Sequence, residues 1–169
     1  MWKKVALLVV VAVFIIGASG GCLSGGIPNL AGNWSGQFNS TLLGMSGTVT
    51  ITGLQQDSSG NFTGGNLVVT YKPAPSDPSK DITLSASLVQ SDSKTDEWTA
   101  TIVGEGTASQ DIPLTSTTTI HSGVTYSFTF VFPHLYGCIG GNANQLSGGY
   151  LLIVEGQKID SGTADITKQ

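Results

Sequence analysis

The 169-residue chain is long enough for one domain, carries a formal net charge of −4 and contains no arginine. Binding to a phosphate backbone needs clustered lysine and arginine, so this composition excludes a nucleic-acid-binding domain. The only cysteines are Cys22 and Cys138, and the fold is therefore expected to rest on its core rather than on a disulfide framework.

Residues 1–21 have the pattern of a secretory signal peptide. Lys3 and Lys4 form a short positive region, and an uncharged apolar run of 12 residues follows from Val5 to Ile16. A membrane-spanning helix needs roughly 20 apolar residues, so this run is short for a permanent span. The sequence predicts export. Ordinary secretion after cleavage near Gly20, or an uncleaved anchor, remain alternatives to the lipid anchor considered next.

Gly20, Gly21 and Cys22 resemble the lipobox of prokaryotic lipoproteins, although Ser19 stands where that family prefers leucine. The resemblance implies cleavage before Cys22 and a diacylglycerol thioether on its sulfur. Fatty-acyl chains such as palmitate would then hold the protein in a membrane. The mature chain would keep five lysines against eleven acidic residues, a formal side-chain charge of −6. The predicted location is extracytoplasmic, at the cell membrane or the envelope surface.

The segment 22–29 is rich in glycine and serine and is predicted to be a flexible leash. Eight residue steps separate Cys22 from Leu30, which corresponds to at most about 27 Å of extended chain. The following domain, 30–169, is therefore expected to lie close to the membrane surface.

From Leu30 onwards the sequence alternates apolar residues with serine and threonine, as a half-buried antiparallel strand requires. The clearest runs are 48–52, 82–88, 98–102 and 125–132, and two closing strands are predicted at 150–154 and 163–167. Turn residues interrupt the pattern at 55–61, 72–78, 91–96, 104–111 and 122–123, and 133–145 is predicted to be irregular. About eight strands with short connections favour an all-β, antiparallel up-and-down barrel or a simple sandwich.

Both ends of this domain carry short motifs. The first strand contains Gly32-Asn33-Trp34, and the last strand ends in Thr167-Lys168. A Gly-x-Trp at the first strand and a basic residue on the last resemble the calycin superfamily of lipocalins, fatty-acid-binding proteins and avidins. The resemblance implies that Trp34 plugs one end of a barrel and that Lys168 packs on its ring through a cation–π contact. Biotin binding is not implied, because Gly36 and Asn66 replace residues of the avidin pattern. A plain core role for Trp34 is the alternative.

No catalytic or metal-binding motif stands out, so the chain is predicted not to be an enzyme and to need no cofactor. His134 and Cys138 are four residues apart on the predicted irregular stretch, which fixes no geometry, and Cys138 is expected to be a small buried residue. The acidic residues around Asp92 are expected to form a solvated turn, and Glu105, Glu155 and Asp160 to be isolated surface acids. Glycosylation sequons begin at Asn33, Asn39 and Asn61.

Two functions compete at this stage. The first is a membrane-tethered barrel that binds a small apolar ligand in its interior, which rests on the calycin-like ends. The second is a structural or protein-interaction module of the cell envelope, including an inhibitor, with a solid barrel and with loops at 72–80 and 133–145 as the contact surface. The protein partner and the oligomeric state are not indicated. The contents of the barrel discriminate between the two functions.

Overall fold

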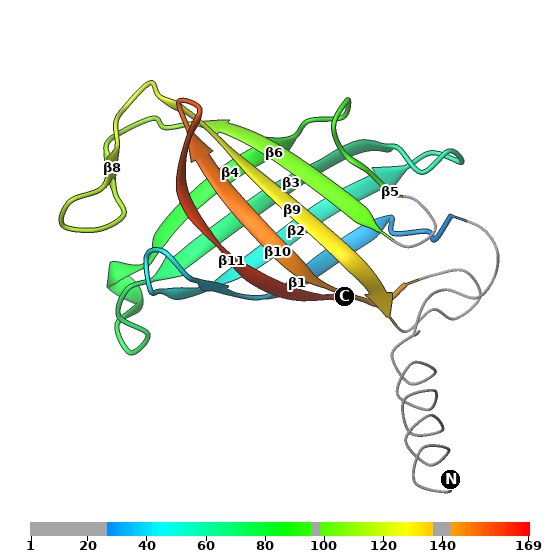
Figure 1. Cartoon of the computed structure of the whole chain (residues 1–169), viewed down its shortest axis with the longest axis horizontal. Coiled ribbons are helices and arrows are strands. Elements are labelled where there is room, and N and C mark those ends of the chain that lie inside the picture. The colour runs from blue at the N-terminus through cyan, green and yellow to red at the C-terminus, as the bar shows by residue number, and fades with distance from the viewer. Residues whose placement is uncertain (1–26, 96–98, 137–142) are drawn as a thin grey trace, which may run out of the picture.

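The computed structural model describes residues 27–95, 99–136 and 143–169. Eight long strands form a closed antiparallel barrel, which confirms the predicted all-β up-and-down architecture (Figure 1). The elements in chain order are β1 (Gly32–Ser40), β2 (Ser46–Gln56), β3 (Phe62–Lys72), the 3₁₀-helix η1 (Pro78–Lys80), β4 (Ile82–Leu88), β5 (Lys94–Thr95), β6 (Ala100–Thr107), β7 (Ile112–Pro113), β8 (Thr119–Ile120), β9 (Thr125–Tyr136), β10 (Gln145–Val154) and β11 (Gln157–Lys168).

The barrel is a simple meander in which each long strand pairs with its neighbours in sequence. The order runs β4-β3-β2-β1-β11-β10-β9-β6, with the short β5 added beside β6. The first and last strands pair over seven residue pairs, from Trp34↔Lys168 to Ser40↔Gly162. Closure between β4 and β6 is much shorter, with only Ser87↔Glu105 and Leu88↔Gly104 paired. The ring of strands is therefore complete but has one weak seam.

The predicted alternation places apolar side chains inside the barrel. Val49 and Ile51 of β2 are buried while Thr48, Thr50 and Thr52 between and beyond them are more accessible. Along β9, the buried side chains are the aromatic residues Tyr126, Phe128, Phe130 and Phe132. The residues between them, Ser127, Thr129 and Val131, are more exposed. Burial of these large rings removes apolar surface from water and is the main driving force for closing the sheet.

Several strands extend beyond their predicted ends. Glycines are typical of turns, but in this barrel some of them lie inside strands and face inwards. β6 continues to Thr107 through Gly104 and Gly106, and β10 begins at Gln145 rather than at Tyr150. β9 continues to Tyr136 although it contains Pro133. Pro133 lies beyond the last β9–β6 pair, at Phe132, and within a register shift against β10, so the missing N–H breaks no ladder there.

Inward glycines stand directly opposite large aromatic residues on the neighbouring strand. The cross-strand pairs are Phe38↔Gly47, Phe128↔Gly104, Tyr126↔Gly106 and Tyr150↔Gly162. A Cβ atom added to Gly47 would lie 2.3 Å from the Phe38 ring, and one added to Gly106 would lie 2.6 Å from the Tyr126 ring. The rings of Phe38, Tyr126 and Tyr150 therefore fill the space that their glycine partners leave, whereas Leu67 and Ala86 lie nearest to Gly104. Alternating large and small residues fill small barrels in this way.

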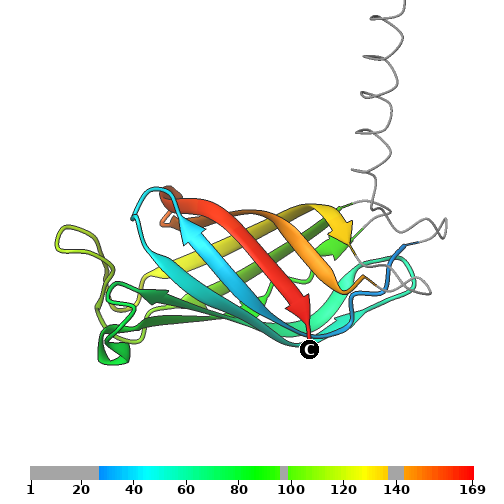
Figure 2. The same cartoon turned by 90° about the horizontal axis from the view of Figure 1, so that it is seen from below.

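The two ends of the barrel differ. The Trp34 end, named for the side chain that lies there, receives residues 27–31 and contains the end of β11 at Lys168. The opposite Asp160 end contains Ser40, Asp160, the β3–β4 loop with η1 and the β7–β8 hairpin. Figures 1 and 2 both show η1 and the β7–β8 hairpin at the end far from residues 27–31.

Candidate functional site

The structure brings Trp34 and Lys168 together at one end of the barrel. Lys168 Nζ lies 5.7 Å from the centroid of the Trp34 ring, and the two residues are direct cross-strand partners. Trp34 is fully buried, and its indole Nε1–H donates a 2.8 Å hydrogen bond to the Leu30 carbonyl. Gly32 has a φ of +127°, and a Cβ atom there would lie 3.1 Å from Lys168 Cε. The glycine of the Gly-x-Trp motif thus leaves room for the lysine stem.

The segment before β1 is fastened to the same end. The side-chain carbonyl of Gln56 accepts a 2.6 Å hydrogen bond from the Leu30 N–H, and its amide donates a 3.0 Å bond to the Pro28 carbonyl. Leu30 and Pro28 are buried. A pocket of about 330 Å³ lies between this segment and the β2–β3 turn, with Ile27 and Ser58 among its lining residues. Residues 27–29, which belong to the predicted leash, therefore lie against the barrel.

A buried polar cluster occupies the other end of the barrel. Asp160 is 0% exposed and accepts hydrogen bonds from Ser40 Oγ at 2.6 Å, Tyr71 OH at 3.0 Å and Tyr150 OH at 2.5 Å. The Phe38 ring packs edge-on against both tyrosines, with centroid distances of 4.9 and 5.1 Å. A buried carboxylate with no cation needs such donors to offset its lost hydration.

The expectation that Asp160 is a surface acid is therefore wrong. The alternation along β11 carries the signal that was missed, because Asp160 is in phase with the inward residues Ala164 and Ile166. Glu105 and Glu155 are exposed, as expected.

The two tyrosines of this cluster are held in their neutral form. Burial is the main cause that raises the pKa of Tyr71 far above the usual tyrosine value, and electrostatic interactions with Tyr150 and Asp160 raise it further. Burial likewise raises the pKa of Tyr150, with its hydrogen bond to Asp160 as the next cause. Neutral phenols are the hydrogen-bond donors that the carboxylate requires, so the cluster is chemically consistent as a structural network.

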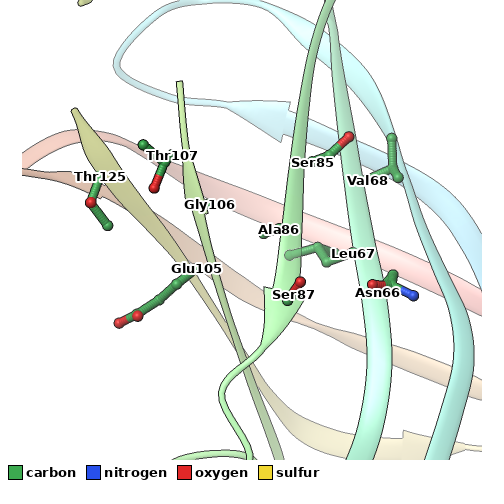
Figure 3. A pocket seen from close by; sticks show the side chains of 10 residues that line it. All are labelled: Asn66, Leu67, Val68, Ser85, Ala86, Ser87, Glu105, Gly106, Thr107 and Thr125. Atoms are coloured by element: carbon green, nitrogen blue, oxygen red, sulfur yellow. The ribbon is translucent and has the colours of Figure 1, made fainter. Parts of the chain in front are cut away.

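A pocket of about 700 Å³ opens at the β4–β6 seam (Figure 3). Figure 3 shows the ribbons of β4 and β6 separating from Ser87 towards Ser85, because Ser87↔Glu105 is the last pair between them in that direction. The Tyr126 hydroxyl donates a 2.8 Å bond to the Ser85 carbonyl and so links β9 to β4 across the seam. Most side chains that line the pocket face outwards and are polar, including Asn66, Ser87 and Glu105. Apolar side chains such as Leu67 and Val68 complete the lining, so the pocket offers both polar and apolar contacts.

The remaining predicted features are the two cysteines, the acidic segment near Asp92 and the glycosylation sequons. Cys22 and Cys138 lie outside the described residues, and so does part of the acidic segment near Asp92. All three sequon asparagines are exposed. The Asn33 Oδ1 atom accepts a hydrogen bond from the Gly53 N–H, and Asn61 Nδ2 donates one to Asp57.

Neither a metal centre nor a spanning helix is found in the described part of the chain. No group of three or more histidine, cysteine, aspartate or glutamate side chains there could hold a metal ion. Within residues 27–95, 99–136 and 143–169, no helix is both long enough and apolar enough to cross a bilayer. No protein-family model, curated protein or solved structure matches this chain.

Proposed function

We propose that this chain is an extracytoplasmic lipoprotein, held at the cell membrane or envelope surface by a lipid on Cys22, and that its barrel is a rigid protein-interaction module. The proposal assigns no catalysis and no cofactor. The lipid rests on the lipobox-like Gly20-Gly21-Cys22 after the apolar run. The calycin-like relationship rests on the Gly-x-Trp strand and on the Trp34–Lys168 contact.

The packing of the barrel interior is the observation that favours a protein-interaction module over a carrier of a small apolar ligand. Aromatic rings contact one another through the interior of the barrel. The centroid of the Tyr150 ring lies 5.1 Å from that of Phe38 and 5.7 Å from that of Phe130. Phe130 is flanked by Phe128 at 6.2 Å and Phe132 at 6.0 Å, and all these rings are almost inaccessible to solvent. An apolar ligand would have to displace these rings, at the cost of the packing that they provide. This filling supports an interaction module.

The lipid is tested by intact-mass spectrometry of the mature protein. We expect loss of residues 1–21 and the added mass of a diacylglycerol and acyl chains on Cys22. A Cys22→Ser variant is the control and should lose both the added mass and membrane association. An unmodified Cys22 thiol in the mature wild-type protein would contradict the anchor.

The filled interior is tested by native mass spectrometry and by binding of an environment-sensitive apolar dye. The wild-type barrel should carry no stoichiometric small molecule and should not bind the dye. Phe130→Ala opens a cavity in the apolar core and should bind it, because engineered apolar cavities accept apolar guests. A small apolar molecule that co-purifies stoichiometrically with the wild type would favour ligand carriage instead.

The partner-facing surface is tested by cross-linking in intact cells. The β3–β4 loop, 73–81, extends from the Asp160 end and is a candidate contact (Figure 2). Replacing residues 73–76 with a Gly/Ser stretch should abolish a specific cross-linked species, whereas the same change in the β2–β3 turn should not. The other predicted contact loop, 133–145, is not continuous irregular chain, because 133–136 belong to β9.

Binding of a small molecule is a second candidate, and the seam pocket is the observation that favours it. Its hydroxyl-rich lining and the exposed Glu105 carboxylate fit a polar or cationic ligand, whereas the sequence favoured an apolar ligand inside the barrel. A thermal-shift screen of polar metabolites against the wild type and Glu105→Gln tests it. A ligand that stabilises only the wild type would support the seam as a binding site.

A further inference from the structure

The attachment of residues 27–31 determines where the chain leaves the barrel. Gln56 binds both Pro28 and Leu30, and the Leu30 carbonyl accepts the Trp34 indole N–H. Ile27 packs against the β2–β3 turn, where a Cβ atom on Gly60 would lie 2.9 Å from its Cγ2 atom. The described part of the chain is therefore attached to the barrel from Ile27 onwards, and this attachment lies at the Trp34 end.

The chain length between Cys22 and this attachment sets an upper limit on how far apart they can lie. Five residue steps separate Cys22 from Ile27, and they span at most about 18 Å in any conformation. A strand of the length of β11, with 12 residues, spans about 40 Å, or about 30 Å along the axis of a barrel with the usual strand tilt. Five residue steps are thus too short to let the Asp160 end approach a membrane to which Cys22 is attached, unless the barrel lies on its side.

We infer that the barrel stands on the membrane with its Trp34 end towards the lipid surface and its Asp160 end towards the solvent. This orientation rests on the proposed lipid at Cys22. The two hydrogen bonds from the Gln56 side chain to Pro28 and Leu30, here called the Gln56 clasp, hold the end of the leash against the barrel. In this orientation the clasp is a positioning contact for the whole domain. The surface offered to a partner is then the Asp160 end, which carries the exposed Leu42 in the β1–β2 turn, the β3–β4 loop and the β7–β8 hairpin.

The orientation is tested with the full-length, lipid-modified protein in phosphatidylcholine vesicles. Two reporters are placed by matched substitutions, Ser58→Cys at the Trp34 end and Ser116→Cys at the Asp160 end, both exposed and both in turns. Cys138→Ser removes the competing thiol. Each cysteine receives the same donor dye, and the vesicles carry a headgroup-linked acceptor whose transfer range is shorter than the barrel. We expect severalfold higher energy transfer from position 58 than from position 116.

Gln56→Ala tests the clasp, and Gln55→Ala is its matched control, since Gln55 is exposed and adjacent. Breaking the clasp should shrink the difference between the two reporters, while the control should preserve it. Equal transfer from both positions in the membrane-bound wild type, or higher transfer from position 116, would overturn the orientation and leave the lipid anchor standing. Protein that stays out of the vesicle fraction would overturn the anchor, and the orientation with it.

Discussion

Asp160 is the only buried acid in the described part of the chain, and three hydroxyl groups donate hydrogen bonds to its carboxylate. Its replacement by asparagine tests that network. Asparagine supplies one acceptor oxygen and a donor NH₂ in place of two acceptor oxygens, so at least one of the hydroxyls of Ser40, Tyr71 and Tyr150 meets a donor. We expect Asp160→Asn to lower the free energy of unfolding by about 1–3 kcal/mol in denaturant titrations.

The control for this substitution is Asp165→Asn on the same strand. Asp165 is exposed and accepts a hydrogen bond from the Ser147 hydroxyl, so its replacement should change stability by about 0.5 kcal/mol or less. Equal effects of the two substitutions would show that the buried cluster contributes no more than a surface contact.

The raised pKa values of Tyr71 and Tyr150 predict a loss of stability at alkaline pH. Above about pH 10 the unfolded chain releases these phenolic protons while the folded barrel keeps them, so the unfolded state binds fewer protons. The stabilising contribution is fully present below that pH. It should fall by up to about 1.4 kcal/mol per pH unit for each tyrosine as the pH rises further. Denaturant unfolding between pH 8 and pH 11 measures this slope.

Tyr71→Phe removes one of the two phenols and should make the alkaline slope shallower. Its stability at neutral pH should fall as well, because Asp160 loses one donor. An unchanged alkaline slope in this variant would contradict the link between the slope and the buried cluster.

At the residue scale, the sequence was informative where a motif had a fixed place on a strand. Trp34 and Lys168 were selected from opposite ends of the chain, and the structure places them as cross-strand partners. Asp160 had no motif, and its charge suggested the surface. Of the hydroxyls that compensate its burial, that of Tyr150 comes from the preceding strand, β10, whereas those of Ser40 and Tyr71 come from β1 and β3, far away in the sequence. Composition could not indicate that these groups meet.

The glycines that face aromatic rings determine how neighbouring strands fit together, and alanine substitutions should rank by the space available. At Gly106 a Cβ atom would lie 2.4 Å from the Ser85 carbonyl oxygen and 2.6 Å from the Tyr126 ring. At Gly104 the nearest atoms belong to Leu67 and Ala86, at 3.1 and 3.2 Å. We expect Gly106→Ala to cost about 3 kcal/mol or more and Gly104→Ala about 1 kcal/mol.

Gly149→Ala is the control, because its nearest contact would be at 3.6 Å and its φ lies outside the left-handed region. It should be close to neutral, as substitutions away from tight contacts usually are. Thermal and denaturant unfolding of the three variants measures the order. A Gly149→Ala variant as unstable as Gly106→Ala would mean that strand glycines matter for reasons other than the opposing ring.

At the element scale, alternation predicted the faces of the strands correctly and their ends poorly. Glycine normally weakens a strand, and the predicted break at 104–111 includes Gly104 and Gly106. Both lie in β6 opposite an aromatic residue of β9, and at Gly106 the Tyr126 ring occupies the space that a side chain would need. That compensation depends on the register of two strands, which a single strand sequence does not contain.

At the scale of the whole molecule, the sequence left a barrel and a sandwich as alternatives because closure depends on few contacts. Pairing of β1 with β11 joins the ends of the chain over seven pairs, but the ring is completed by only two pairs between β4 and β6. The Tyr126 hydroxyl reinforces that seam from β9. Such sparse closure leaves no pattern in either strand that alternation alone could reveal.

A closed meander whose two chain ends meet can be opened at a different turn, and circular permutation tests this property. The Gln169 N–H donates a 2.9 Å bond to the Asn33 carbonyl, so the chain ends at the Trp34 end beside β1. A permutant of 27–169 joins these ends with a short Gly/Ser linker and begins at Ser76 in the β3–β4 loop. It should keep the native far-UV spectrum and lose only about 1 kcal/mol, because loop closure costs change slowly with length.

The same permutation with new ends between Thr50 and Ile51 is the matched control. It cuts β2 between its pairings with β1 and β3, and it should not fold, because both ladders and the buried Ile51 are interrupted. If the permutant that begins at Ser76 also failed to fold, the β3–β4 connection would have to be part of the folding nucleus. Stability would then depend on the order in which the strands join as well as on the closed ring of strands.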